Sequence, residues 1–320
     1  MDALSDVLRV TRLSGGVFLH AEFSAPWCIA TRLTPELCAP VLGPAAQLIV
    51  YHYVVEGELR LRVEGEGGNA VTLGAGEVAL LPRNDLHLMG SDLGLPPVPG
   101  REVIQPPEKG GLFTIRHGGN GARTRMVCGF LGCDDAERNP VISALPAVLK
   151  LDLGQDGAAR WVRSTFWYAA EEIAAGRPGS DAVLAKVSEL LFVEAVRRYA
   201  EGLPEGQTGW LAGLRDPYVA RALALVHRDI ARPWTVTALG RAVGLSRSAL
   251  AERFIHLIGM PPMHYLASWR MQVAMQELRN TGASLARVAE MVGYESEAAF
   301  SRAFKKTVGT APATWRRARV

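Results

Sequence analysis

Two stretches near the C-terminal end of the chain carry polar and basic side chains at spacings that suit contact with nucleic acid. In the first stretch, the side chains expected on one face are Arg247, Ser248, Glu252 and Arg253; in the second they are Glu297, Ser301, Arg302, Lys305 and Lys306. Such side chains can hydrogen-bond to base edges in the major groove, and the basic ones can pair with phosphates. The chemistry that these residues predict is recognition of duplex DNA.

The two stretches are copies of one sequence pattern. Residues 243–262 (VGLSRSALAERFIHLIGMPP) align with residues 292–312 (VGYESEAAFSRAFKKTVGTAP), with one extra residue between the first Gly and the Phe of the second copy. An internal repeat of this kind indicates one supersecondary unit that is used twice. The matching positions are Gly244 with Gly293, Phe254 with Phe304, Gly259 with Gly309, and Pro262 with Pro312.

Each copy fits a helix-turn-helix. A short amphipathic segment, 235–242 or 284–291, precedes a Gly that can adopt a positive φ in a turn. A second helix then begins at a polar cluster and buries two apolar residues. These are Ser246, Leu250 and Phe254 in the first copy, and Glu295, Ser296, Phe300 and Phe304 in the second. The alternative is a plain helical bundle with a duplicated packing motif.

Charge is distributed unevenly along the 320 residues. Residues 208–320 contain 16 Lys and Arg against 7 Asp and Glu, a net charge of +9, whereas the other 207 residues carry a net charge of −6. A basic part joined to an acidic part suggests a module that binds a polyanion and is fused to another domain. This distribution and the duplicated pattern together favour DNA binding over the bundle alternative.

Composition excludes several classes of protein. With 48% hydrophobic and 21% charged residues, the chain has enough apolar material for two cores and is not intrinsically disordered. No uncharged apolar run reaches the roughly 18–20 residues of a membrane helix, and the N-terminus does not resemble a secretory signal. Four Cys do not make a disulfide framework. We therefore expect a cytoplasmic protein with reduced thiols.

The N-terminal half is predicted to form strands and the remainder to form helices. Aromatic, β-branched and alternating residues predict strands within 45–91 and at 124–133, whereas the Pro- and Gly-rich segment 92–122 predicts a long loop or flap. Apolar residues three and four apart predict helices at 159–176 and 180–202. The expected fold class is α+β: an N-terminal antiparallel β-barrel followed by helices, then an all-α domain with two helix-turn-helix subdomains. The expected boundaries are 1–140, 141–207 and 208–320.

Residues 215–318 resemble the DNA-binding domain of the AraC/XylS family of transcription regulators. The resemblance is carried by RPWTVTALGRAVGLSRSALAERFIHLIGMPPMHYL, by ASWRMQVAMQELRN and by SLARVAEMVGYESEAAFSRAFKKTVGTAPATWR. It implies two helix-turn-helix subdomains, joined by a long helix at 262–280, that contact successive major-groove segments on one face of the DNA. The base-contact positions that it implies are Ser248, Ala251 and Glu252 in the first copy and Ala298, Ala299 and Arg302 in the second.

The two copies differ in how well they keep the family's pattern at these positions. The acidic Glu252, followed by Arg253, departs from the usual pattern of the first copy. It could accept a hydrogen bond from cytosine or pair with Arg253. Arg302 keeps the common pattern of the second copy, and an arginine at such a position suits guanine.

Residues 76–91 (GEVALLPRNDLHLMGS) look like the second signature of cupin barrels, which implies a cupin-like sensor in residues 1–140. Three residues match that signature, and they are Gly76, Pro82 and His87. Asn84 stands where the signature has a second Gly, and Ser91 stands where it has Asn. The first signature keeps His52 but has Val54 in place of its second His.

In such a barrel, His52 and His87 would point inward, and Cys128 and Cys133 could join them. Two imidazoles with one or two thiolates suit Zn²⁺, which is the cofactor that this set of donors suggests. The alternatives are a thiol-based redox response at Cys128, an organic ligand, or a purely structural role. Cys28 and Cys38, expected in an exposed N-terminal arm, are further candidates for oxidation.

These features predict a sequence-specific transcription regulator whose N-terminal domain senses a metal ion, an oxidant or a small molecule. RNA polymerase is a further expected partner, and no catalytic residue is assigned. The alternative is a cupin-type metal-dependent enzyme with a helical appendage, which the lost His of the first signature disfavours. An apolar face within residues 181–201 predicts a homodimer through the N-terminal half. That face comprises Val183, Leu184, Val187, Leu190, Leu191, Phe192 and Val196.

Overall fold

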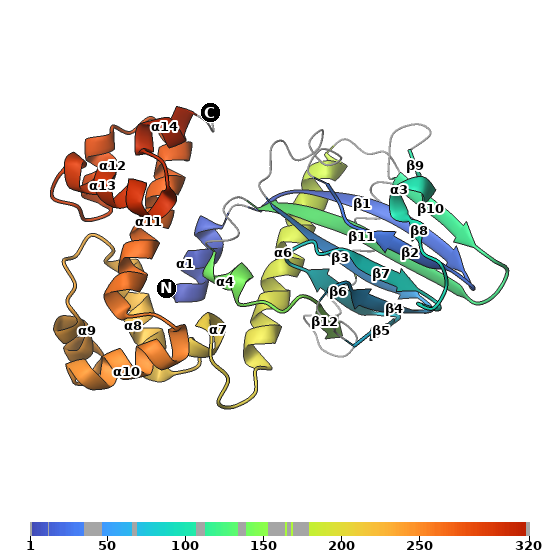
Figure 1. Cartoon of the computed structure of the whole chain (residues 1–320), viewed down its shortest axis with the longest axis horizontal. Helices are drawn as coiled ribbons and strands as arrows, with labels where there is room; N and C mark the ends of the chain where they lie inside the picture. The colour runs from blue at the N-terminus through green and yellow to red at the C-terminus, as the bar shows by residue number, and fades with distance from the viewer. Residues whose placement is uncertain are drawn as a thin grey trace. The chain divides into compact units, whose positions relative to one another are not determined.

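The computed structural model divides the chain into two compact units (Figure 1). The β unit comprises residues 11–201, and the helical unit comprises residues 1–10 together with residues 202–320. This division differs from the expected one, because residues 141–201 belong with the strands and residues 1–10 belong with the C-terminal helices. The structure describes residues 2–11, 13–34, 47–65, 69–106, 113–133, 139–152, 164, 168 and 179–317.

The β unit contains two sheets. Within the described strands, hydrogen bonds form two sheets that face one core and do not close into a single ring of strands, in the predominantly antiparallel β domain that the sequence predicts. Most neighbouring strands are antiparallel, as expected, but β1 pairs with β10 and β2 pairs with β8 in parallel. The first sheet has the order β12 (Leu149–Asp152), β6 (Glu77–Leu81), β3 (Gln47–Glu56), β11 (Arg123–Cys133), β1 (Leu13–Ser24), β10 (Phe113–Gly118) and β9 (Ile104–Gln105). The second has the order β5 (Val71–Gly74), β4 (Glu58–Val63), β7 (His87–Gly90), β2 (Cys28–Thr31) and β8 (Val98–Pro99).

One apolar core draws on both sheets. The alternation in β4 shows how the sequence builds it, because Leu59, Leu61 and Val63 are buried while the residues between them are more exposed. Successive side chains of a strand point to opposite faces, so this pattern buries one face of the sheet. Other members of the same core come from β1, β2, β3, β6, β7, β10 and β11, and they include Phe23, Ile29, Val50, Leu81, Met89, Ile115 and Cys128.

Helix α6 (Ser180–Glu201) packs on the first sheet through its contacts with β1 and β11 (Figure 1). The Tyr51 hydroxyl of β3 and the Ser188 hydroxyl of α6 form a buried hydrogen bond of 3.0 Å. Six apolar residues of α6 are also buried among those that the structure describes: Val187, Leu191, Phe192, Ala195, Val196 and Ala200. Much of the face that suggests a dimer interface therefore packs within the chain, while Leu190 is exposed.

The described parts of the segment 92–122 contain regular elements where the sequence predicts a long loop. It contains β8, the short helix α3 (Gly100–Val103), β9 and β10, and β10 extends the first sheet beside β1. The run Phe113–Gly118 forms a strand because it pairs with the edge of β1. This pairing depends on the tertiary fold and could not be predicted from the local sequence. A second short helix, α4 (Pro140–Ser143), precedes β12. The helix predicted at 159–176 falls almost entirely outside the described residues.

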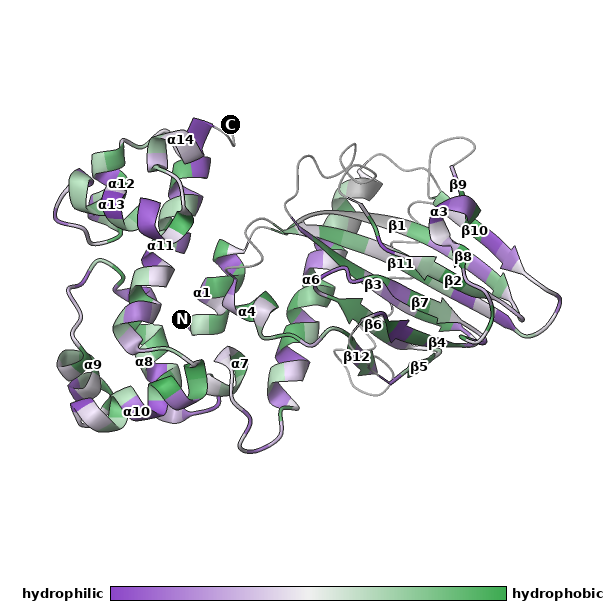
Figure 2. Ribbon diagram, viewed as in Figure 1, coloured by the Kyte–Doolittle hydropathy of each residue, from purple (hydrophilic) through white to green (hydrophobic). Residues whose placement is uncertain are grey.

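The helical unit matches the expected all-α domain. Gly, Pro and hydroxyl residues mark the ends of its helices, and α11 occupies the 262–280 range that the resemblance implies for the connecting helix. Hydrophobic and hydrophilic residues share each helix, as expected for helices with one face against a core (Figure 2). Its helices are α1 (Ala3–Val10), α7 (Trp210–Gly213), α8 (Pro217–Arg228), α9 (Val236–Val243), α10 (Arg247–Ile258), α11 (Pro262–Asn280), α12 (Leu285–Met291), α13 (Glu297–Val308) and α14 (Pro312–Arg317).

The N-terminal helix α1 is part of the helical unit although some 190 residues separate the two in sequence. It contacts α8 and α11, and its buried residues are Ala3 and Val7. None of the described helices is long and apolar enough to cross a membrane.

Candidate nucleic-acid interface and sensor core

The first helix-turn-helix consists of α9 and α10. Gly244 ends α9 in the left-handed conformation with φ of 85°, which a residue without a Cβ adopts at little cost. The Ser246 hydroxyl then caps α10 by accepting a hydrogen bond of 3.1 Å from the Ala249 amide. Leu250 and Phe254 are fully buried, so the opposite face of α10 is directed outward.

The second helix-turn-helix, α12 and α13, repeats these devices. Gly293 adopts φ of 79° in the turn, and the Ser296 hydroxyl accepts a hydrogen bond of 3.2 Å from the Ala299 amide. Phe300 and Phe304 are fully buried, and Phe304 packs edge-on against Trp315. Both recognition helices have 12 residues and end at a left-handed glycine. The repeat in the sequence is therefore a repeat in structure.

Most of the residues expected to contact DNA are exposed. The exposed residues are Arg247, Ser248, Glu252 and Arg253 of α10 and Glu297, Ala298, Arg302, Lys305 and Lys306 of α13. Ala251, Ala299 and Ser301 are half-buried, so only part of each side chain can face a ligand.

Arg253 is engaged within the protein. Its guanidinium lies 2.6 Å from the Asp216 carboxylate and 5.2 Å from the centre of the Tyr218 ring. The same carboxylate group caps α8 by accepting hydrogen bonds from the amides of Tyr218 and Val219. Arg253 thus joins the recognition helix to the start of α8. The spacing of the repeat does not point to Asp216, although an Asp directly before a Pro is a helix-start signal.

His52, His87 and Cys128 meet inside the β unit. His52 and Cys128 are register partners on β3 and β11, and His87 comes from β7 of the other sheet. The Nδ1 atom of His52 lies 3.0 Å from Cys128 Sγ, and its Nε2 atom lies 2.9 Å from His87 Nε2. The three groups form a chain with His52 in the middle, rather than a ring around one point.

One arrangement of protons satisfies the whole chain. His87 Nδ1 lies 2.8 Å from the Asp85 carbonyl oxygen, which can only accept, so this nitrogen donates. His87 Nε2 is then the acceptor for His52 Nε2–H, and His52 Nδ1 is the acceptor for the Cys128 thiol. Burial favours these neutral forms, because it lowers the pKa of His52, lowers the pKa of His87 to about 4 and raises the pKa of the Cys128 thiol.

This arrangement does not fit a Zn²⁺ ion bound by all three groups. Cys128 and His87 lie on opposite nitrogens of the His52 ring, so one ion in this arrangement can contact at most two of the three side chains. Zinc sites in proteins generally use three or four protein ligands. In the part of the chain that the structure describes, no three His, Cys, Asp or Glu side chains are grouped to hold a metal ion.

Cys133 and Cys28 do not join this chain. Cys133 is five positions from Cys128 on the same strand, and an odd separation places it on the opposite face of the sheet. Cys28 was expected in an exposed arm, but it lies buried on β2 between β7 and β8. Burial raises the pKa of its thiol there. Cys38 lies outside the described residues.

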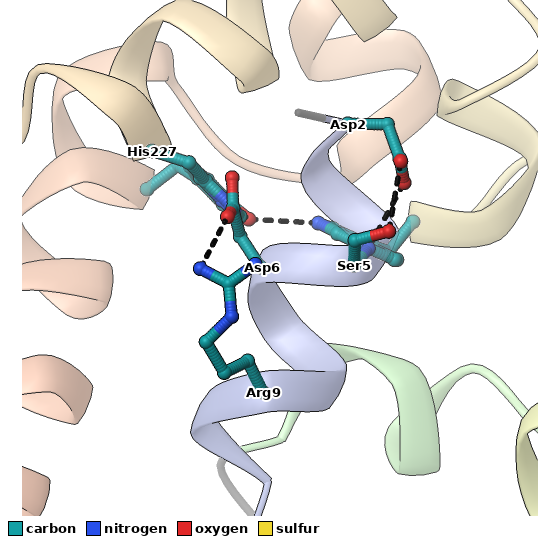
Figure 3. A network of polar contacts seen from close by, with 7 residues as sticks. Asp2, Ser5, Asp6, Arg9 and His227 are labelled. Atoms are coloured by element: carbon teal, nitrogen blue, oxygen red, sulfur yellow. Dashed lines mark hydrogen bonds and ion pairs between the residues drawn. The ribbon is translucent and has the colours of Figure 1, made fainter.

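A second buried polar chain, which the sequence analysis missed, crosses the helical unit. The Trp210 indole donates to the Tyr265 hydroxyl at 2.8 Å, and that hydroxyl lies 2.8 Å from His227 Nε2. Since the indole can only donate, the hydroxyl donates to His227, and the proton of neutral His227 sits on Nδ1. That atom faces the Asp6 carboxylate of α1 at 4.0 Å (Figure 3). Burial lowers the pKa of His227 to about 3 and raises the pKa of Asp6.

Comparisons with known proteins agree with this architecture. A family model described as Cupin matches residues 2–201, and one described as a helix-turn-helix domain matches residues 239–318. A putative AraC-like transcription regulator of Streptomyces antibioticus is 30% identical, with 99% of each chain covered. Its counterpart in Streptomyces lividans is 31% identical, with 99% of this chain and 98% of that protein covered. Among solved structures, the DNA-binding domain of AdpA in complex with a target DNA is 28% identical over 32% of this chain and 92% of that chain, with a TM-score of 0.31.

Proposed function

Since the chain belongs to the AraC-like transcription regulators, with a cupin N-terminal domain and a DNA-binding helix-turn-helix domain, we propose that α10 and α13 recognise its target sequence. The observation that carries this proposal is the pair of equivalent helices, each begun by a serine cap and each exposing polar side chains opposite a buried aromatic face. A helix of this kind fits the major groove.

The exposed residues take different roles in this proposal. Arg302 is the base reader of α13, with its guanidinium directed to guanine, while Lys305 and Lys306 bind phosphates. In α10, Ser248 and Glu252 face the bases. Arg253, predicted to touch DNA, instead positions α10 through Asp216.

Two substitutions in α13 test these roles in the full-length protein. Arg302→Ala should cost about 1–3 kcal/mol at the specific site and relax preference at one base pair. Lys305→Ala should weaken binding to all sequences alike and reduce the salt dependence by about one counterion. Fluorescence anisotropy over a salt series measures both effects. Binding that is independent of salt and sequence would exclude this function.

The sensor core is proposed to be the chain formed by Cys128, His52 and His87. It is the line of hydrogen bonds that joins the two sheets through the apolar core, so a signal that removes one of its protons must rearrange that core. We also propose that the protein acts in the cytoplasm as a homodimer with RNA polymerase as a partner, and that it has no enzymatic activity. Light scattering tests the dimer, and a mass near 34.5 kDa at micromolar concentrations would contradict it.

Three treatments of the purified full-length protein test the sensor. DNA binding is measured after addition of Zn²⁺, of a chelator or of hypochlorite, in the wild type and in His87→Ala. A response to hypochlorite that His87→Ala abolishes supports a thiol response within the chain, whereas a response to Zn²⁺ or to the chelator supports a metal that rearranges the histidines. If none of the treatments changes DNA binding by the wild type, the chain senses neither a metal ion nor this oxidant.

A further inference from the structure

The turn of the second helix-turn-helix touches the first helix-turn-helix subdomain directly. A Cβ added to Gly293 would lie 2.5 Å from the Ala231 carbonyl oxygen and 2.7 Å from Ala231 Cα, both of which belong to the segment between α8 and α9. Distances below 3.0 Å to backbone atoms are not tolerated, so only glycine permits this approach. The backbones of the two subdomains therefore meet directly at Gly293, beside the Arg270 side chain, whose Nη2 atom would lie 2.6 Å from the added Cβ.

Arg270 of the connecting helix α11 holds the same place together. Its Nε donates to the Ile230 carbonyl oxygen at 3.0 Å, and its Nη2 donates to the Arg232 carbonyl oxygen at 3.0 Å. The guanidinium also lies 5.6 Å from the centre of the Tyr294 ring, in the turn that Gly293 begins. One half-buried side chain thus contacts the first subdomain, the connecting helix and the second subdomain. We refer to Arg270, Gly293, Tyr294 and residues 230–232 as the inter-subdomain contact.

This contact adds a constraint that a connecting helix alone does not supply. Helix α11 packs into the first subdomain through Tyr265, which contacts Phe254, and into the core of the second through Met271 and Met275. With α11 as the only connection, the two subdomains could still move relative to one another where α11 bends between these residues. Arg270 has a planar fork of donors that fits two carbonyl oxygens in one orientation, so it fixes rotation as well as distance. The separation of α10 and α13 is therefore set by α11 together with the inter-subdomain contact.

We propose that the inter-subdomain contact determines which spacing between two DNA half-sites the protein accepts, with Arg270 as the positioning residue. The proposal rests on the proposed recognition of DNA by α10 and α13. One inserted base pair moves a half-site by about 3.4 Å and turns it by about 34° around the helix axis. A rigid pair of subdomains cannot follow this displacement, whereas a pair that pivots can.

Gly244 provides a matched control for Gly293. Both glycines occupy the turn of a helix-turn-helix with nearly the same positive φ, 85° and 79°, so substitution by Ala introduces similar backbone strain at each. A Cβ at Gly244, however, meets nothing within 4 Å. Both variants therefore introduce the backbone strain of an Ala at positive φ. Gly293→Ala in addition pushes the two subdomains apart, whereas Gly244→Ala does not. Arg270→Ala and Arg270→Lys remove the fork without changing the backbone of the turn, and the Lys variant keeps the charge.

The experiment compares two duplexes with the full-length protein. The first is selected by the wild type from a randomised pool. The second is the same duplex with one base pair inserted between the two segments that α10 and α13 contact. The wild type and Gly244→Ala should bind the second at least about 10-fold more weakly, because one helix loses its base contacts. In Gly293→Ala and both Arg270 variants, the ratio of the affinities for the first and the second duplex should fall below about 3-fold. Thermal unfolding checks that each variant is folded.

Two results would overturn the inference in different ways. A wild type that selects a duplex but tolerates the insertion, or Arg270 variants that retain the wild-type ratio, would contradict the role of the inter-subdomain contact alone. A wild type that selects no sequence would contradict the proposed function and the inference with it.

Discussion

Replacing Val7 by Asp should release helix α1 and loosen the first helix-turn-helix subdomain. Val7 is 1% exposed, and α1 contacts α8 and α11. Burying a Val side chain contributes about 1.5–3 kcal/mol, and an unpaired carboxylate at the same place costs more than undocking the helix. We therefore expect the variant to lose docking of α1 and, with it, about 2 kcal/mol of local stability in α8.

Hydrogen exchange followed by mass spectrometry measures this loss in the full-length protein. A loss of about 2 kcal/mol corresponds to exchange about 30-fold faster at the amides of α8, because each 1.4 kcal/mol is a factor of ten. The amides of α13 are an internal reference, since α13 packs in a separate cluster with Trp315 and Val288. Their exchange should not change.

Ser5→Asp is the matched control for Val7→Asp. It introduces the same residue two positions away, where Ser5 is exposed. The favourable position of a carboxylate near the start of a helix offsets part of its repulsion from Asp2, whose carboxylate accepts a hydrogen bond from the Ser5 hydroxyl (Figure 3). We expect α8 of this variant to exchange as in the wild type. Equal protection of α8 in the two variants would refute the reasoning, because α1 would then contribute nothing to the subdomain.

Three further predictions concern buried groups and one helix cap. Burial lowers the pKa of His227 to about 3, so as the pH falls below about 6.5 the unfolded chain binds a proton that the folded protein does not, and the free energy of unfolding decreases. Urea unfolding should show the wild type losing up to about 1.4 kcal/mol more per pH unit than His227→Gln between pH 6 and 4, and parallel losses would contradict this. Asp216→Ala should lower the free energy of unfolding by about 1–2 kcal/mol, because it removes the cap of α8 and the partner of Arg253. Asp216→Asn keeps a capping oxygen, so its free energy of unfolding should fall by less. Equal losses in the two variants would exclude the cap as the cause. Since burial raises the pKa of the Cys128 thiol, iodoacetamide should label Cys128 far more slowly in the native protein than in urea, and similar rates by mass spectrometry would show that the sheets open readily.

The helical unit could be predicted in detail because its signals are local. Gly244 and Gly293, the serine caps and the buried aromatic residues all lie within one short repeat, and each acts on the helix beside it. What the sequence does not show is how the copies contact one another. Arg270 gives no local sign that it reaches residues 230–232, since that contact depends on the tertiary fold.

The sensor core could be predicted only in part, because its residues meet across the fold. His52, His87 and Cys128 do come together, but their order in a chain follows from side-chain positions that no spacing rule gives. The place of Cys133 was available from the two-residue period of a strand, which puts it on the other face from Cys128. Cys28 was expected to be exposed because the four residues of its strand are too few to show an alternation of apolar and polar residues. Its burial follows from pairing of that strand with β7.

The central claim is that α10 and α13 recognise a DNA sequence together. The most direct measurement is selection of duplexes from a randomised pool by the full-length wild type and by Arg302→Ala, followed by sequencing. The account predicts two preferred segments about one helical turn apart, and loss of preference at one base pair of one segment in Arg302→Ala. A single preferred segment, no preference at all, or an unchanged preference in Arg302→Ala would contradict it.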